Sequence, residues 1–125
     1  MTYTERYFKE FLMGKLHEQL VKDLKSLSAV VSITIHDEKS ETWVLEIIQG
    51  TLGSVSHGPA PSECSFVMDA ATFKEIARGR YQPEQAFFEG RVNIEGNMEK
   101  ALQVATALTE FCKSYPFEPK DDGKR

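Results

Sequence analysis

The side chains best suited to holding a metal or attacking a substrate are three histidines and two cysteines, which lie far apart in the sequence: His17, His36, His57, Cys64 and Cys112. None has a partner at the spacing of a metal site, such as HxxxH or CxxC. We therefore interpret each histidine as exposed or hydrogen-bonded. The cysteines are expected as reduced, buried thiols, with a disulfide between them as the alternative. The sequence predicts no metal site and no cofactor.

Phosphate binding and acid–base catalysis have equally little support in the sequence. Residues 50–54 are rich in glycine but lack the Gly-Lys-Ser/Thr ending of a phosphate loop, and residues 90–96 do not follow the dinucleotide-binding pattern. The carboxylates are scattered over expected loops, helix caps and polar faces, where a solvated surface explains them best. No catalytic residue is predicted, which favours a binding protein over an enzyme.

The composition is that of a small globular domain. The 125 residues are 41% hydrophobic and 27% charged, with a formal net charge of −4. No nucleic-acid partner is expected, because an acidic chain lacks the positive charge that attracts phosphates. No segment approaches the roughly 20 apolar residues of a membrane span, and the chain does not begin with a signal-peptide pattern. We expect a cytoplasmic protein with one domain over residues 1–114 and a polar tail over residues 115–125.

The first part of the chain is predicted to be helical. Thr4 is a plausible N-cap, and Gly14 leaves open whether there is one helix or two. Apolar residues recur at spacings of three and four, which places them on one helical face: Tyr7, Phe8, Phe11, Leu12, Leu16, Leu20, Leu24 and Leu27.

Strands are predicted next, because apolar and polar residues alternate and β-branched residues are frequent. Four segments have this pattern: residues 29–36, 42–48, 51–57, and the run through Cys64, Phe66 and Met68. A tight turn at Gln49-Gly50 would join the second and third strands.

The second half of the chain changes to a helical period. Asp69 and Asn97 are expected to cap two helices, and Pro83 is expected in the first turn of a short helix between them. A short strand is predicted within residues 90–96. Strands and helices in this order predict an α+β or mixed α/β domain with one sheet and helices on one face.

Apolar residues are abundant for so small a domain, and eight of them are phenylalanines. They either form a solid core or surround a cavity between sheet and helices that holds an apolar ligand. Methionine suits such a lining, because it repacks around different ligands. The residues concerned are Phe66, Met68, Phe73, Phe87, Phe88, Met98, Leu102, Leu108 and Phe111.

Three blocks of the sequence resemble the sterol carrier protein type 2 family of lipid-transfer domains. They are residues 41–55 with a tryptophan-bearing strand, residues 64–73, and residues 83–98. The third block is the most specific, since it contains a proline, then Ala-Phe, a glycine, an alternating strand and Gly-Asn-Met. The resemblance covers roughly residues 30 to 110 in the family's order and spacing.

This resemblance implies a five-stranded mixed sheet covered on one face by helices, with an apolar tunnel between the layers. It implies a non-enzymatic protein that binds and transfers a sterol, fatty acid, fatty acyl-CoA, phospholipid or isoprenoid, with transient membrane contact. Residues 108–117 would form a lid. Ten residues would touch the ligand: Leu45, Ile47, Phe66, Met68, Phe87, Phe88, Met98, Leu102, Ala105 and Phe111.

Some features depart from the family pattern, and two other functions stay open. Ala105 takes the place of a polar glutamine, which implies a more apolar tunnel. The end of the chain lacks a peroxisomal address, which favours a bacterial or cytosolic member. The first alternative is an accessory protein that presents a hydrophobic intermediate to a partner enzyme. The second is an enzyme that uses Cys64 or Asp69 in the pocket.

Overall fold

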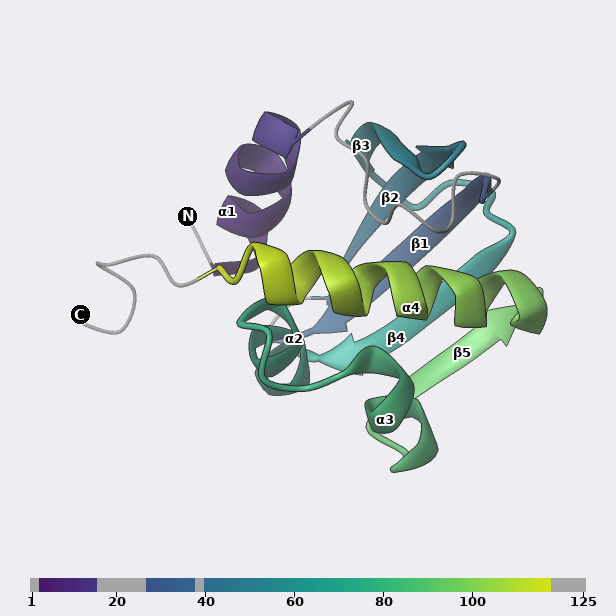
Figure 1. Ribbon diagram of the computed structural model, residues 1–125. Coiled ribbons are helices and arrows are strands. Elements are labelled where there is room, and N and C mark those ends of the chain that lie inside the picture. Colours follow the sequence, from purple (N-terminus) through teal and green to yellow (C-terminus); the bar gives the residue numbers. More distant parts are fainter. Residues whose placement is uncertain (1–2, 16–26, 38–39, 118–125) are drawn as a thin grey trace.

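The computed structural model describes residues 3–15, 27–37 and 40–117, which form one sheet with helices beside it (Figure 1). The sheet has five strands in the order β3-β2-β1-β4-β5. Their bounds are β1 Ala29–His36, β2 Ser40–Ile48, β3 Thr51–His57, β4 Cys64–Asp69 and β5 Val92–Gly96. The pair β1 and β4 is parallel, and the other three neighbouring pairs are antiparallel. The predicted α+β fold with a five-stranded mixed sheet is confirmed.

The helices lie on one side of this sheet (Figure 1). They are α1 Tyr3–Arg6, continued by the π-helical η1 Tyr7–Leu12 and the 3-10 turn η2 Met13–Lys15, then α2 Ala70–Ala77, α3 Pro83–Phe88 and α4 Met98–Ser114. The long helix α4 contacts β1, β4 and β5, whereas η1 and η2 contact β3. The two groups of helices therefore cover opposite ends of the same sheet face.

The alternation of the strands determines which side chains face the helices. Ile33 of β1 lies in register between Trp43 of β2 and Phe66 of β4, and all three side chains are buried. The next residue, Thr34, points to the other face, where its hydroxyl lies 2.9 Å from that of Thr42. Apolar rows on one face and hydroxyl groups on the other are what a period of two produces.

The turn between β2 and β3 is the tight hairpin that the sequence predicts. Gln49 and Gly50 have φ angles of 51° and 77°. Positive φ at both central residues is typical of the type I′ turn, whose twist matches that of the strands. The amide of Gly50 also donates a hydrogen bond to the carbonyl of Leu27 (2.8 Å), which ties the turn to the start of β1.

Both predicted helix caps are confirmed. The Asp69 side chain accepts a hydrogen bond from the amide of Thr72 at 2.7 Å and begins α2. The Asn97 side chain accepts one from the amide of Lys100 at 3.0 Å and begins α4. Pro83 occupies the first turn of α3, where its missing N–H costs nothing.

The first helix differs from the prediction. Thr4 lies inside α1 and does not cap it, because the helix already includes Tyr3 and the Thr4 side chain is buried in packing. Gly14 does not divide the described helical run, which continues from Tyr3 to Lys15. The predicted helical residues Leu16, Leu20 and Leu24 lie outside the described residues.

Two strand boundaries also differ from the prediction. Strand β2 begins at Ser40, because its pairing with β1 extends to His36, whose Nδ1 lies 2.7 Å from the Ser40 hydroxyl. Strand β5 begins only at Val92. The amide of Arg91 donates to the carbonyl of Ala86 (2.8 Å), so this residue belongs to the turn that follows α3.

The cap at Asp69 gives a pH-dependent prediction. Asp69→Ala is expected to lower the free energy of unfolding by about 1 kcal/mol at pH 7. Hydrogen bonds from Thr72 hold the pKa of this carboxyl below its ordinary value. A lowered folded-state pKa stabilises the fold above the unfolded pKa of about 4, and this contribution disappears as the pH falls through the folded value. Urea unfolding should therefore show a smaller difference between wild type and variant at low pH.

The matched control is Asn97→Ala, which removes a cap of the same geometry without an ionisable group. Its cost should also be about 1 kcal/mol but should not change with pH. A pH-independent difference for Asp69→Ala would contradict the prediction.

Candidate functional site

An apolar cavity of about 30 Å³ lies between the sheet and the helices, where η1, α2 and α4 meet. Thirteen of its lining side chains are hydrocarbon or thioether groups, and the other two carry a hydroxyl and a thiol. The lining residues are Tyr7, Phe8, Leu12, Ile33, Leu45, Leu52, Phe66, Met68, Phe73, Ile76, Ala77, Pro83, Leu108, Phe111 and Cys112. A wall of this chemistry suits an apolar molecule.

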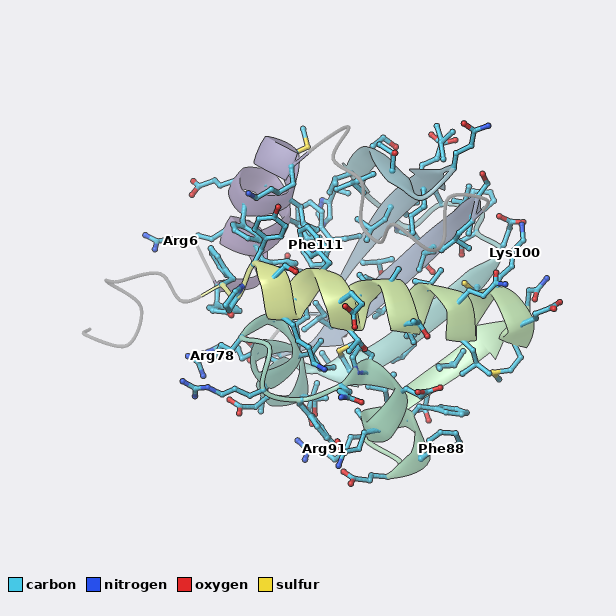
Figure 2. All side chains as sticks on the ribbon, in the orientation of Figure 1. Arg6, Arg78, Phe88, Arg91, Lys100 and Phe111 are labelled. Carbon is cyan, nitrogen blue, oxygen red and sulfur yellow. The ribbon has the colours of Figure 1, made fainter. Side chains whose placement is uncertain are left out.

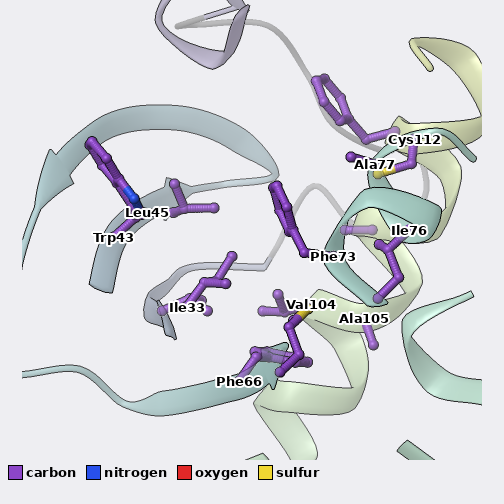
Figure 3. Close-up of a cluster of buried hydrophobic side chains, with 14 of the residues drawn as sticks. Ile33, Trp43, Leu45, Phe66, Phe73, Ile76, Ala77, Val104, Ala105 and Cys112 are labelled. Carbon is purple, nitrogen blue, oxygen red and sulfur yellow. The ribbon is translucent and has the colours of Figure 1, made fainter. Parts of the chain in front are cut away.

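The sheet forms one wall of the cavity through the inward-facing residues of four adjacent strands. Ile33 comes from β1, Leu45 from β2, Leu52 from β3, and Phe66 and Met68 from β4. All five side chains are buried. Figure 3 shows Ile33, Leu45 and Phe66 grouped opposite the helical side chains. The period of two in these strands thus builds a continuous apolar floor.

Aromatic rings form much of the helical wall. Phe8 of η1 is fully buried, and its ring stacks on Trp43 at 5.0 Å between centroids and on Phe73 of α2 at 5.5 Å. Tyr7 meets Phe73 edge to face at 5.2 Å. Such ring pairs contribute about 0.5–1.5 kcal/mol each beyond their buried area. They fix the first helix against the sheet and α2.

Phe117 ties the end of α4 to the other helices beside the cavity. Its ring packs on Tyr3, Tyr7 and Phe11 at centroid distances of 5.1, 5.3 and 5.0 Å. Its amide donates to the carbonyl of Ala77 (2.9 Å), and its carbonyl accepts from the Tyr3 hydroxyl (2.7 Å). Phe117 therefore packs against the helices although it belongs to the predicted polar tail. The lid function of residues 108–117 stays a prediction.

Four of the ten residues predicted to touch a ligand line this cavity. They are Leu45, Phe66, Met68 and Phe111. Ile47 and Ala105 are buried in the core beside other side chains. Figure 3 shows Ala105 on α4 near Ile76. Ligand contact itself stays a prediction for all ten.

The other four predicted ligand residues do not line this cavity, and of these Phe87 and Leu102 are half-buried, with Phe87 packed against the core, while Phe88 and Met98 are exposed. Phe88 is 74% exposed and Met98 is 41% exposed. Helix α3 has only six residues and turns Pro83 and Ala86 inward, which leaves Phe88 directed to solvent (Figure 2). An apolar residue pattern on so short a helix does not determine which residues are buried.

Sequence reasoning missed the contribution of the first helix to the cavity. Tyr7, Phe8 and Leu12 line it beside Phe73 of α2, which the sequence had named among the candidate core or cavity residues. The stripe of Tyr7, Phe8 and Leu12 was visible as an apolar helical face, but the family resemblance began only near residue 30. This apolar stripe was the sequence signal that the first helix packs on the sheet and forms part of the helical wall of the cavity.

The cavity is small compared with a ligand pocket. Its volume of about 30 Å³ is that of a gap between side chains. Pockets for small-molecule ligands have volumes of about 300–1,000 Å³. A lipid chain would therefore enter only if the helices moved away from the sheet or the lining side chains changed rotamer.

The polar atoms of the lining lie next to each other. The Tyr7 hydroxyl is 3.8 Å from the Cys112 sulfur, and both side chains are buried. Burial raises the pKa of Tyr7 well above its ordinary value and raises the pKa of the Cys112 thiol to about 11. Both groups are therefore protonated and neutral at pH 7.

The surroundings of Cys64 and Asp69, the two residues considered for catalysis, do not favour a catalytic role. Cys64 is buried at the start of β4, and burial raises the pKa of its thiol, which disfavours the nucleophilic thiolate. Asp69 caps α2 through Thr72, and the hydrogen bonds that lower its pKa keep it ionised. Neither residue lines the cavity. Asp69 therefore has a structural role as the N-cap of α2.

Among the described residues there is no cluster of three metal-ligating side chains. His57 packs on the Trp43 ring at 4.4 Å between centroids, and His36 is bonded to Ser40. His17 lies outside the described residues. Both cysteines are buried and form no disulfide. In this part of the chain, no helix is both long and apolar enough to cross a membrane.

The family profile and the similar proteins found by sequence comparison point to the same family. The sequence profile of the SCP-2 sterol transfer family matches residues 8–109. Human sterol carrier protein 2 is 27% identical over 100 residues, which are 78% of this chain and 18% of that protein. The oleate-induced peroxisomal protein POX18 of Candida maltosa is 27% identical over 118 residues, with 87% of this chain and 90% of that protein covered.

A longer relative and a solved structure agree with this family assignment. Mouse hydroxysteroid dehydrogenase-like protein 2 is 28% identical over 101 residues, which are 74% of this chain and 20% of that protein. The chain thus spans about a fifth of the human and mouse proteins. A crystal structure of sterol carrier protein 2 superimposes with a TM-score of 0.66 at 22% identity, covering 80% of this chain and 86% of that one.

Proposed function

The chain belongs to the SCP-2 sterol transfer family, and on this premise we propose that it binds and carries a lipid or other apolar small molecule without converting it. The candidate ligands are a sterol, a fatty acid, a fatty acyl-CoA, a phospholipid or an isoprenoid. The cavity between sheet and helices carries this proposal, because thirteen of its fifteen lining side chains have no hydrogen-bonding hydrogen. Burying a ligand there gains about 0.8 kcal/mol per methylene group without any charged contact.

The size of the cavity adds a condition to this function. With about 30 Å³ between closely packed rings, the structure corresponds to a closed state. A ligand would select or create a more open state in which η1 or α4 lies farther from the sheet. Backbone ladders join the strands of the sheet wall to one another, whereas η1 and α2 meet the sheet mainly through packed rings and aliphatic side chains. We therefore expect the helical wall to be the part that moves.

A second function is favoured by one observation. The mouse relative is named as a dehydrogenase-like protein and is about five times longer than the matching region. A domain of this kind joined to a dehydrogenase-like segment would present a hydrophobic intermediate to an enzyme. For this chain the corresponding proposal is an accessory protein with a separate partner enzyme. Recovery of a biosynthetic enzyme in a pull-down, together with no lipid transfer between vesicles, would favour it over the carrier function.

The compartment and the membrane contact belong to the same proposal. A carrier has to meet a membrane transiently to collect its ligand, and we propose a cytoplasmic location for this exchange. The raised pKa of the buried Cys64 thiol and the use of Asp69 as the cap of α2 favour a carrier over an enzyme that uses either residue.

A pair of matched substitutions on α4 tests whether this cavity binds the ligand. Leu108→Trp is expected to weaken binding of a fluorescent fatty acid at least tenfold, because Leu108 lines the cavity and a larger ring would fill it. Leu108 is only half-buried, so the ring has room to be accommodated without unfolding. Fluorescence titration measures the affinity, and the melting temperature checks the fold.

The control is Leu102→Trp, the same change on the same helix at another half-buried position. Leu102 does not line the cavity, so its variant should bind as the wild type does. Loss of binding in Leu102→Trp with normal binding in Leu108→Trp would place the ligand elsewhere. No saturable binding of any lipid to the wild type would contradict the proposed function itself.

A further inference from the structure

Two residues that line the cavity have polar side chains, Tyr7 and Cys112, and they come from helices that are far apart in the sequence. We call the pair of their hydroxyl and thiol groups the polar end of the cavity. We propose that Tyr7 and Cys112 bind the hydroxyl or carbonyl group of an otherwise apolar ligand, and that the cavity selects long-chain alcohols, ketones and esters over ionised fatty acids. This proposal rests on the proposed carrier function and names the chemical class of its ligand.

The position of the two groups is the first argument. Among the lining side chains, only Tyr7 and Cys112 carry a hydrogen on oxygen or sulfur, and these two atoms are 3.8 Å apart. The other thirteen side chains are apolar. A cavity with all of its polar side-chain atoms at one point holds a chain-like ligand in one orientation, with the polar group of the ligand at that point.

The weak bond between the two groups is the second argument. Sulfur is a poor acceptor, and a distance of 3.8 Å is long even for a bond to sulfur, so the buried Tyr7 hydroxyl has no strong partner among the described residues. A ligand oxygen would accept from this hydroxyl at about 2.7–2.8 Å. Binding would thus replace a weak hydrogen bond with a normal one, and the Cys112 thiol could donate to the same oxygen.

The absence of charge at this end is the third argument. No lysine or arginine lines the cavity in the described part of the chain. Burial keeps the Tyr7 hydroxyl and the Cys112 thiol protonated, because it raises the pKa of each. An ionised carboxylate placed here would lose its hydration without gaining a counter-ion, which is costly in an apolar site. A neutral oxygen needs only the hydrogen bond.

The neighbouring Tyr3 provides a built-in comparison. Its ring packs on Phe117 and Phe73 in the same aromatic group, but its hydroxyl donates to the carbonyl of Phe117 at 2.7 Å and it does not line the cavity. Removal of the Tyr3 hydroxyl therefore changes packing near the site without changing the polar end. Removal of the Tyr7 hydroxyl changes the polar end without removing the ring.

The experiment measures displacement of bound pyrene by 1-dodecanol, dodecane and dodecanoate at pH 7.5, for the wild type, Tyr7→Phe and Tyr3→Phe. In the wild type we expect 1-dodecanol to bind more tightly than dodecanoate. Tyr7→Phe should weaken 1-dodecanol three- to tenfold and leave dodecane within twofold of its wild-type affinity. Tyr3→Phe should leave the ratio of the affinities for 1-dodecanol and dodecane unchanged.

Two results would overturn the proposal while the carrier function stands. One is an equal effect of Tyr7→Phe on 1-dodecanol and dodecane. The other is tighter wild-type binding of dodecanoate than of 1-dodecanol. If pyrene and all three chains fail to bind the wild type, the carrier function fails, and the polar end has no role in binding. The melting temperature of Tyr7→Phe should stay near that of the wild type, because the change removes only a weak hydrogen bond.

Discussion

Alanine at Gly96 is expected to lower the free energy of unfolding by about 3 kcal/mol or more. Gly96 ends β5 with a φ angle of 93°, a conformation that costs a residue with a Cβ about 1–2 kcal/mol. An added Cβ would also lie 3.0 Å from the Cα of Cys64 and still closer to the carbonyl oxygen of Glu63. These are backbone atoms of the paired strand, so they cannot turn away, and overpacking of this kind costs a further 1–3 kcal/mol or so.

The collision would spread to the start of α4. The same Glu63 carbonyl accepts a hydrogen bond from the amide of Asn97 at 2.9 Å, and Asn97 caps the helix. A displaced Glu63 would thus weaken the end of the β4–β5 ladder and the cap together. Urea unfolding followed by circular dichroism measures the loss, with the midpoint as the readout.

Gly90→Ala is the matched control for this prediction. Gly90 has a φ angle of 79°, but an added Cβ would meet no atom within 4 Å. Its cost should therefore be the conformational part alone, about 1–2 kcal/mol. Equal losses in the two variants would show that the backbone near Glu63 moves without cost, and would contradict the steric argument.

The strands and caps were predictable because their signals are local. Alternation of apolar and β-branched residues identified β1 and β3 at their observed bounds, and side chains such as Asp69 and Asn97 identify a helix start from a single position. The family resemblance implied a five-stranded mixed sheet, but the order β3-β2-β1-β4-β5 and the parallel pairing of β1 with β4 were not predicted. Pairing between segments about 30 residues apart has no signal in the periodicity of either one.

The site was harder to predict because its lining depends on which helix covers which strand. Leu45, Phe66 and Met68 were predictable as inward positions of strands. Phe87 and Phe88 are equally apolar, but the fold uses Pro83 and Ala86 as the inward side of α3. Tyr7 and Cys112 are 105 residues apart, so their approach is a property of the tertiary structure alone.

Phe8→Ala is expected to destabilise the protein by about 3–5 kcal/mol while enlarging the cavity. Phe8 is fully buried, lines the cavity and stacks on both Trp43 and Phe73, so its removal takes away buried area and two ring contacts. The space it leaves is bordered by apolar side chains, and such spaces stay dry and accept apolar molecules. Addition of benzene or 1-dodecanol should therefore raise the melting temperature of Phe8→Ala more than that of the wild type, since a ligand of the folded state stabilises it by mass action.

The same measurement on Phe88→Ala separates a cavity from a general effect of apolar solutes. Phe88 is 74% exposed, so its removal should cost less than about 0.5 kcal/mol and should create no binding space. A rise in melting temperature that is equal in both variants would mean that the solutes act on the surface. A rise confined to Phe8→Ala would connect the stability of the aromatic wall directly to the capacity of the site, because the ring that holds the first helix to the sheet also occupies the volume a ligand would need.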